Sequence, residues 1–280
     1  MNPRVSNLRF ARAPRSFTYF FITCIALALL APMNFVIITP GNPSPLFPKI
    51  LSISQSTGVK QVKSYPANGQ LYLLTILVTN PDTRVLGAAI SGCWVWGDCV
   101  VVPRSAIYQE DTSTEKEIKA SKKEMDTSQS IALTAARGQL AKRFPEVDLS
   151  QVSDSTVKVS LKNTGGPSGG LIFALGIVEL FTPTDILQGR KIAGTGTISA
   201  NGEVGPIGGI VEKIIGAKKV GAELLFISKA NCDELPESVE GISVIAVETL
   251  DQVVSFLVND SQESEQANSA GIQGCASVRA

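Results

Sequence analysis

The chain has 280 residues, of which 44% are hydrophobic and 18% charged, and its basic and acidic residues are equal in number. This length suits one sizeable domain with additions or two small domains, and zero net charge gives no general electrostatic basis for binding nucleic acid. Five cysteines are too few for a disulfide scaffold, and the absence of histidine removes the usual partners of a zinc site. Neither nucleic acid nor a metal is therefore expected as a ligand.

A mainly apolar segment, residues 17–38, follows a basic N-terminal stretch, residues 1–16. Its length of about 22 residues is enough for a helix that crosses a bilayer. Because basic residues stay on the cytoplasmic side, the sequence predicts a single-pass signal anchor in the cell membrane, with the N-terminus cytoplasmic and the rest of the chain outside. A cleaved signal peptide is the alternative, since Ala26-Leu27-Ala28 resembles a cleavage site, although it lies within the apolar segment.

Residues 39–111 are predicted to form a β-rich extracytoplasmic region, with a buried strand at 71–79. Two interpretations of Trp94 and Trp96 are open, contact with the membrane interface or packing beneath a loop, and we favour packing. Cys93 and Cys99 are close enough in sequence to form a disulfide outside the cytoplasm, but free, partly buried thiols are the favoured interpretation.

The remainder divides into three predicted parts. Residues 112–155, which begin with a capping-box pattern and many charges, are predicted to be a helical linker. Residues 156–258 alternate strand and helix patterns, including a hairpin signal at Asn201-Gly202, and predict a compact α+β domain. Residues 259–280 are rich in small and polar residues and are predicted to be disordered.

A glycine-rich turn, residues 165–170, delivers Ser168 to the start of an apolar helix. Glycines permit the tight turn that exposes a nucleophile and let backbone N–H groups approach a developing oxyanion. The competing interpretation is structural, with Ser168 serving only as the N-cap of that helix.

Lys213 is the candidate base for Ser168, because the chain contains no histidine. On a helix its same-face neighbours are Gly209, Gly216 and Ala217, which leave a slot for the lysine side chain, and Glu212 is expected to point elsewhere. Burial in such a slot disfavours the charged amine and lowers its pKa. A lysine extending to solvent from the edge of the helix is the alternative.

Three motifs together resemble the proteolytic domain of Lon proteases, most closely the bacterial membrane-anchored Lon-like proteases that lack an ATPase domain. They are Gly166-Pro167-Ser168-Gly169-Gly170, Gly194-Thr195-Gly196-Thr197-Ile198, and residues 204–213 with Lys213 at their end. The resemblance is strong over residues 157–257, and Asn231-Cys232 also fits that subgroup.

The resemblance implies a serine endopeptidase with a Ser-Lys dyad. Ser168 would be the nucleophile and Lys213 the general base of an acyl-enzyme mechanism, with Thr195 hydrogen-bonding the lysine and Gly166, Pro167 and Gly169 shaping the turn. Protein or peptide substrates are implied, and a homo-oligomer is suggested. No cofactor is expected, and without a phosphate-binding Gly-x-x-x-x-Gly-Lys-Ser/Thr motif the sequence gives no support for ATP dependence.

The sequence departs from the Lon pattern around Ser168. An acidic residue is expected three positions before the serine and an alanine directly after it, where this chain has Gly165 and Gly169. Gly169 is expected to add freedom beside the nucleophile. The main alternative function is a catalytically silent scaffold or binding protein at the membrane that keeps the fold; a phosphate-binding protein is a more distant one.

Overall fold

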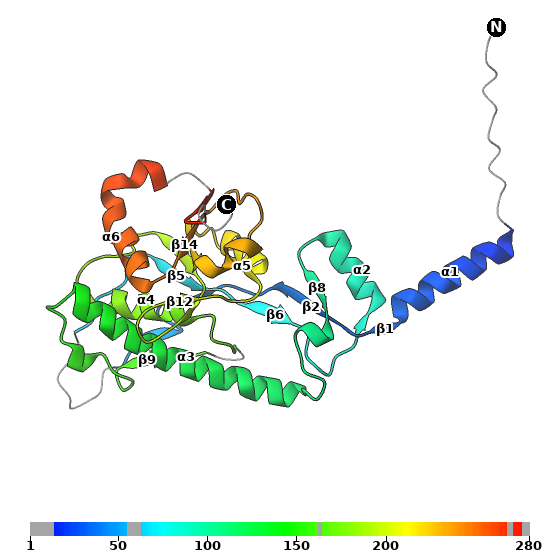
Figure 1. Ribbon diagram of the computed structural model, residues 1–280, viewed down its shortest axis with the longest axis horizontal. Helices are drawn as coiled ribbons and strands as arrows, with labels where there is room; N and C mark the ends of the chain where they lie inside the picture. The colour runs from blue at the N-terminus through cyan, green and yellow to red at the C-terminus, as the bar shows by residue number, and fades with distance from the viewer. Residues whose placement is uncertain (1–13, 55–62, 162–163, 268–270, 276–280) are drawn as a thin grey trace, which may run out of the picture.

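The computed structural model describes residues 14–54, 63–161, 164–267 and 271–275 (Figure 1). Most of the predicted basic segment 1–16 lies outside these residues. The first helix, α1 (Arg15–Leu30), projects from one end of the molecule, and α2 (Gly87–Trp96) lies beside its base (Figure 1). The remaining helices pack around a central sheet at the other end.

The central sheet has six strands in the order β15-β14-β13-β10-β5-β3. Neighbouring strands are parallel except for β3, which is antiparallel to β5. Their bounds are β3 (Ser44–Pro45), β5 (Gln70–Leu73), β10 (Lys191–Gly194), β13 (Leu224–Ser228), β14 (Ser243–Val247) and β15 (Gly271–Gln273).

Helices cover both faces of this sheet. Along β13, Leu224 and Phe226 belong to one buried cluster, whereas Leu225 and Ile227 belong to another on the opposite face. The first cluster contains α3 (Thr114–Arg143), α4 (Gly170–Phe181) and α6 (Leu250–Ala267), and the second contains α5 (Ile210–Lys219). A strand buried on both faces reads as a nearly continuous apolar run, and β13 is apolar from Leu224 to Ile227 before it ends at the buried Ser228. The arrangement is the mixed helix and sheet domain that the sequence predicts.

Smaller sheets surround the central one. A hairpin of β11 (Thr197–Ile198) and β12 (Val204–Gly205) turns at Asn201-Gly202, as predicted. The other strands are β1 (Pro32–Met33) with β7 (Val85–Leu86), β4 (Leu51–Ile53) with β9 (Val157–Val159), and β2 (Phe35–Pro40) between β6 (Ile76–Val78) and β8 (Val100–Pro103); short 3₁₀ turns are η1 (Arg104–Ala106), η2 (Leu149–Gln151) and η3 (Lys229–Glu234).

The predicted continuous helix over residues 17–38 is wrong in its C-terminal third. Helix α1 ends at Leu30, because Pro32 cannot continue it, and the β-branched residues after Asn34 pair as strand β2 with β6 and β8. In the part of the chain that the structure describes, no helix combines the length and apolarity needed to cross a membrane.

The predicted helical linker corresponds to a single helix, α3, that belongs to the core. Its first half is mostly exposed, but Met125, Ala132, Leu133, Ala136 and Leu140 are buried in the cluster that contains α4. Ser113 caps its N-terminus by accepting a hydrogen bond from the Lys116 N–H at 3.4 Å. The helix therefore forms one wall of the domain that carries Ser168.

The C-terminal segment is more ordered than predicted. Helix α6 continues to Ala267, and β15 adds to the edge of the sheet beside β14. A disulfide between Cys232 and Cys275 fixes this strand to η3. Cys93 and Cys99 also form a disulfide, so the favoured interpretation of free thiols is wrong. Of the predicted disordered tail, residues 268–270 and 276–280 lie outside the described residues.

Candidate active site

Ser168 lies in the turn immediately before the buried helix α4. The helix begins at Gly170, its N-cap residue is Gly169, and no side chain caps it. The Ser168 hydroxyl therefore does not cap α4. This excludes the alternative interpretation, in which Ser168 serves only as the N-cap of that helix. The residue is partly exposed and stands at the N-terminal end of a helix, where the helix dipole favours developing negative charge.

Helix α3 holds this turn from the side. The Gly166 N–H donates to the carbonyl oxygen of Ser121 at 2.9 Å, and the Ser128 hydroxyl donates to the carbonyl oxygen of Pro167 at 3.0 Å. Gly166 has φ +84°, a conformation that other residues rarely adopt. A Cβ on Gly165 would collide with Ser121, so glycine is needed there for close approach. The shape of the turn is thus fixed by contacts from a distant helix.

Lys213 and Thr195 form a buried pair beneath Ser168. Lys213 is 2% exposed and Thr195 is fully buried. The lysine Nζ donates to Thr195 Oγ1 at 3.1 Å, and the threonine hydroxyl donates to the carbonyl oxygen of Ser168 at 3.2 Å. Because the threonine hydrogen is directed at Ser168, its oxygen can only accept from the lysine. The observed link between Lys213 and Ser168 is therefore indirect, through Thr195.

The carbonyl oxygen of Ser168 receives a second hydrogen bond, from the Gly196 N–H at 2.9 Å. The Gly196 carbonyl oxygen in turn accepts from the Leu171 N–H at 3.1 Å, in the first turn of α4. These bonds tie the segment after β10 to the start of α4. The three predicted residues, from three separate segments, are thereby brought together.

Burial dominates the electrostatics of Lys213. It lowers the pKa of the amine from 10.5 to about 8, and the negative charge of Glu212 offsets part of that shift. Glu212 is itself buried, and its charge acts on the lysine although Glu212 is not one of the same-face neighbours of Lys213 on the helix. At a pKa near 8, a substantial fraction of Lys213 is neutral in mildly alkaline solution and can accept a proton.

The start of α5, which carries Lys213, is held by Asn231. This fully buried amide accepts from the Ile207 N–H at 3.1 Å and donates to the Ile207 carbonyl oxygen at 2.8 Å. Its amide group also donates to Glu234 at 2.8 Å. Gly209, the N-cap of α5, has φ +69°, which favours glycine. The loop before Lys213 is thus fixed at its backbone.

Residues 107–260, more than half of the chain, match the Lon protease (S16) C-terminal proteolytic domain. The chain belongs to this family. The predicted family is confirmed. It is a family of serine-type peptidases, the class of enzyme that the sequence predicts.

Several Lon proteases are similar to the chain. Lon protease 2 of Herpetosiphon aurantiacus is 29% identical over 238 residues, which cover 77% of this chain and 28% of the relative. The Lon protease of Roseiflexus castenholzii is 32% identical over 146 residues (50% of this chain, 18% of the relative). Lon protease 2 of Bacillus subtilis is 39% identical over 101 residues (36% and 18%). The chain thus spans less than a third of the length of these curated relatives.

The departure from the Lon pattern at Gly169 has a packing cause. Its φ of −88° is accessible to any residue, so the backbone conformation does not require glycine. A Cβ there would lie 2.8 Å from side-chain carbons of both Leu73 and Phe173. The expected freedom beside the nucleophile is thus replaced by close contact with two core side chains.

The sequence did not predict that Ser121 and Ser128 contact the Ser168 turn. Both lie on α3, about forty residues before Ser168, in a segment whose many charges suggested a solvated linker. The only available signal was the apolar repeat in the second half of that segment, which indicates a packed face. Nothing in the spacing of the serines themselves points to Ser168.

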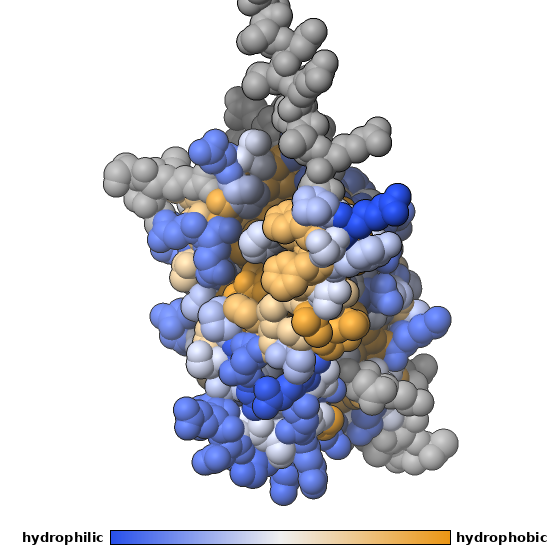
Figure 2. All heavy atoms as spheres, turned by 90° about the vertical axis from the view of Figure 1, so that its right-hand side faces the viewer, coloured by the Kyte–Doolittle hydropathy of each residue, from blue (hydrophilic) through white to orange (hydrophobic). Residues whose placement is uncertain are grey.

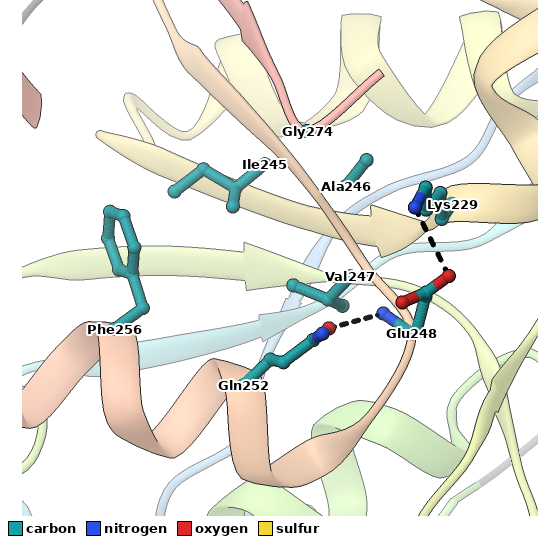
Figure 3. A pocket seen from close by; sticks show the side chains of 8 residues that line it. All are labelled: Lys229, Ile245, Ala246, Val247, Glu248, Gln252, Phe256 and Gly274. Atoms are coloured by element: carbon teal, nitrogen blue, oxygen red, sulfur yellow. Dashed lines mark hydrogen bonds and ion pairs between the residues drawn. The ribbon is translucent and has the colours of Figure 1, made fainter. Parts of the chain in front are cut away.

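A shallow pocket of about 260 Å³ lies away from the Ser168 turn, between β14, α6 and the C-terminal strand (Figure 3). Its lining includes an ion pair between Lys229 and Glu248 at 3.2 Å, and Gln252 accepts from the Glu248 N–H (Figure 3). None of the predicted site residues lines it. In the described part of the chain, no group of three or more acidic residues and cysteines is arranged to hold a metal.

Proposed function

We propose that the protein is a serine endopeptidase that cleaves peptide bonds in proteins or peptides, with Ser168 as nucleophile and Lys213 as general base. The buried Lys213–Thr195 pair beneath Ser168 carries the proposal. Burying a lysine with a neutral hydrogen-bond partner is costly and serves no packing need that methionine or leucine would not meet. A catalytically silent scaffold has no use for it.

The proposed reaction begins with neutral Lys213. Its amine takes the proton of the Ser168 hydroxyl as the oxygen attacks the substrate carbonyl carbon, forming a tetrahedral intermediate. Lys213 then returns the proton to the leaving amine, the carbon–nitrogen bond breaks, and an ester on Ser168 remains. Lys213 then takes a proton from water, whose oxygen attacks the ester carbon. The bond between that carbon and Ser168 Oγ breaks, the carboxylic acid product leaves, and Lys213 returns the proton to Ser168.

Two features support this sequence of steps. Thr195 accepts a hydrogen bond from one N–H of Lys213. This bond restricts rotation of the amine and so limits the directions in which its lone pair can point. The indirect link seen between Lys213 and Ser168 is compatible with the proposal, because catalytic hydrogen bonds often tighten only when substrate is bound. The backbone N–H groups of Ser168 and Gly169, which precede α4, are the proposed donors to the oxyanion.

We further propose that α1 attaches the enzyme to a membrane and that the protease domain lies outside the cytoplasm. Helix α1 has 16 residues, is exposed along nearly its whole length, and carries no charge after Arg15. Two disulfides, Cys93–Cys99 and Cys232–Cys275, support an oxidising compartment. The predicted cytoplasmic N-terminus rests on the arginines before α1. Independence from ATP and homo-oligomer assembly remain predictions.

The proposed activity is tested by incubating the purified full-length chain, in mild detergent without ATP, with an unfolded protein substrate. Fragments should appear with the wild type and be absent with Ser168→Ala. A control, Ser199→Ala, changes a serine on the β11–β12 hairpin and should keep full activity. Equal fragmentation by wild type and Ser168→Ala, or none by either across a range of pH and ATP, would contradict the proposal.

A further inference from the structure

The C-terminal end of α2 carries three large apolar side chains with almost no protein around them. Trp94, Val95 and Trp96, here called the tryptophan tip, are 82%, 80% and 79% exposed. The expectation that the tryptophans pack beneath a loop is therefore wrong. Figure 2 views the end of the molecule from which α1 projects and shows an apolar patch there, with hydrophilic side chains around it.

The tip is held in a fixed position. Gly97 ends α2 with φ +73°, and its N–H donates to the carbonyl oxygen of Cys93. The disulfide between Cys93 and Cys99 closes the turn directly behind the tip. The exposed tryptophans therefore belong to a helix end that is held rigidly. Exposing their apolar rings to water is unfavourable in free energy.

Helix α2, which ends in the tip, contacts α1 at its other end. Helix α2 starts at Gly87, and a Cβ there would collide with the Ala28 carbonyl oxygen, so the two helices touch backbone to backbone. No charged residue occurs between Arg84 and Asp98 or between Arg15 and Lys49. The hydroxyls of Thr23 and Ser91 each donate to a carbonyl oxygen one turn earlier, both at 2.9 Å, so neither hydroxyl needs water as a hydrogen-bond acceptor.

This chemistry fits a lipid bilayer better than a protein partner. Residues 19–22 are all large, apolar and exposed, and successive residues on a helix point about 100° apart, so α1 is apolar around its circumference. A protein groove covers one side of a helix, whereas lipid covers every side. Tryptophan is enriched where hydrocarbon meets headgroups, because its ring is apolar and its N–H needs a polar partner.

We propose that the tryptophan tip enters the headgroup region of the bilayer that holds α1, as a second contact beside the helix. This rests on the membrane attachment in the proposed function. One inserted helix leaves the protease domain free to tilt and rotate about it. A second, rigid contact fixes the height and tilt of the domain, and with them the distance of Ser168 from the membrane surface.

The chain contains two tryptophans, and both are in the tip, so its intrinsic fluorescence reports on this contact alone. The experiment uses full-length Ser168→Ala protein reconstituted into phosphatidylcholine–phosphatidylglycerol vesicles. Lipids brominated near the headgroup or near the chain end serve as quenchers. We expect the tryptophan emission to be shifted to the blue relative to that of the unfolded chain in detergent-free buffer. We also expect lipids brominated near the headgroup to quench it more strongly than lipids brominated near the chain end.

A matched control places a tryptophan elsewhere. In a Trp94→Phe/Trp96→Phe background, Ile118→Trp puts the indole on α3 at a position that is 62% exposed. Its emission should stay unshifted and unquenched, which would show that quenching is specific to the tip.

The outcomes separate the two proposals. Protein that does not float with vesicles would overturn the membrane attachment and the inference with it. Protein that floats, but whose tip stays unshifted and unquenched, would overturn the inference and leave attachment by α1 standing. A blue shift without bromine quenching would also overturn it, because it would show that the tip packs against protein, such as a second copy of the chain.

Discussion

Replacing Lys213 with methionine should stabilise the fold while abolishing proteolysis. The lysine is 2% exposed, and burial lowers its pKa from 10.5 to about 8. The same desolvation that prepares the amine as a base therefore makes the folded state less stable at neutral pH. Methionine matches the length of the side chain and carries no charge.

The expected gain follows from linkage. The difference between 10.5 and about 8, at about 1.4 kcal/mol per pKa unit, corresponds to about 3.5 kcal/mol. Below about pH 8 the lysine is charged in both folded and unfolded chains, and the full cost applies. Between about pH 8 and 10.5 only the unfolded chain holds the proton, so wild-type stability rises with pH and the cost disappears.

Two smaller effects modify this value. Thr195 loses the donor to its oxygen, which costs about 1 kcal/mol, although its hydroxyl still donates to Ser168. Glu212 loses a nearby positive charge. A net stabilisation of about 2 kcal/mol at pH 7 is therefore expected, falling to zero or below near pH 10.5.

The assay is urea unfolding followed by far-UV circular dichroism, with disulfides intact, in a Ser168→Ala background that prevents self-cleavage. The double variant is compared with Ser168→Ala at pH 7 and pH 10. Lys218→Met, on the exposed C-terminal end of α5, is the control and should show no such dependence. Equal or lower stability of Lys213→Met at pH 7 would refute the claim that the lysine is held at a cost.

Further predictions concern the groups around the dyad. Thr195→Val removes the hydrogen bonds to Lys213 and Ser168 and should lower kcat/KM by about tenfold to a hundredfold, measured with a peptide substrate, whereas Thr197→Val on the neighbouring strand should not. Ser128→Ala removes the hydroxyl that holds Pro167 and should lower kcat several-fold with little change in the melting temperature, a loss that Ser128→Thr should partly restore. Glu179 on α4 is buried and its pKa is raised to about 7, chiefly by desolvation, so the folded state retains a proton that the unfolded state loses above about pH 4.5. Wild-type stability from this group therefore falls between pH 4.5 and 7, and Glu179→Gln should raise stability by up to about 3 kcal/mol at pH 8 and little at pH 4, measured by thermal unfolding. An unchanged difference at the two pH values would show that the Glu179 proton is not linked to folding.

The central residues of the site could be predicted from the sequence because each lies in a short, recognisable motif. Ser168 stands within a glycine-rich turn, and Lys213 within a helix whose spacing can be read directly. The strand from Leu224 to Ser228 is equally clear, since its apolar run is short and ends in a polar residue.

What the sequence could not show depends on contacts between distant segments. The hydrogen bonds from α3 to the Ser168 turn join residues about forty positions apart, and no periodicity encodes them. Apolar character alone could not decide between helix and strand after Leu30, where pairing of β2 with β6 and β8 determined the outcome. Exposure of Trp94 and Trp96 likewise became visible only once their surroundings were known.

The proposed dyad is tested most directly by the pH dependence of Ser168 acylation. Full-length protein is reacted with a serine-directed acylating probe over a range of pH, and the rate of labelling is followed by mass spectrometry. The rate should rise with an apparent pKa near 8, that of Lys213, and should be abolished in Lys213→Met at every pH. Labelling of Ser168 at the wild-type rate in Lys213→Met would contradict the assignment of Lys213 as the base.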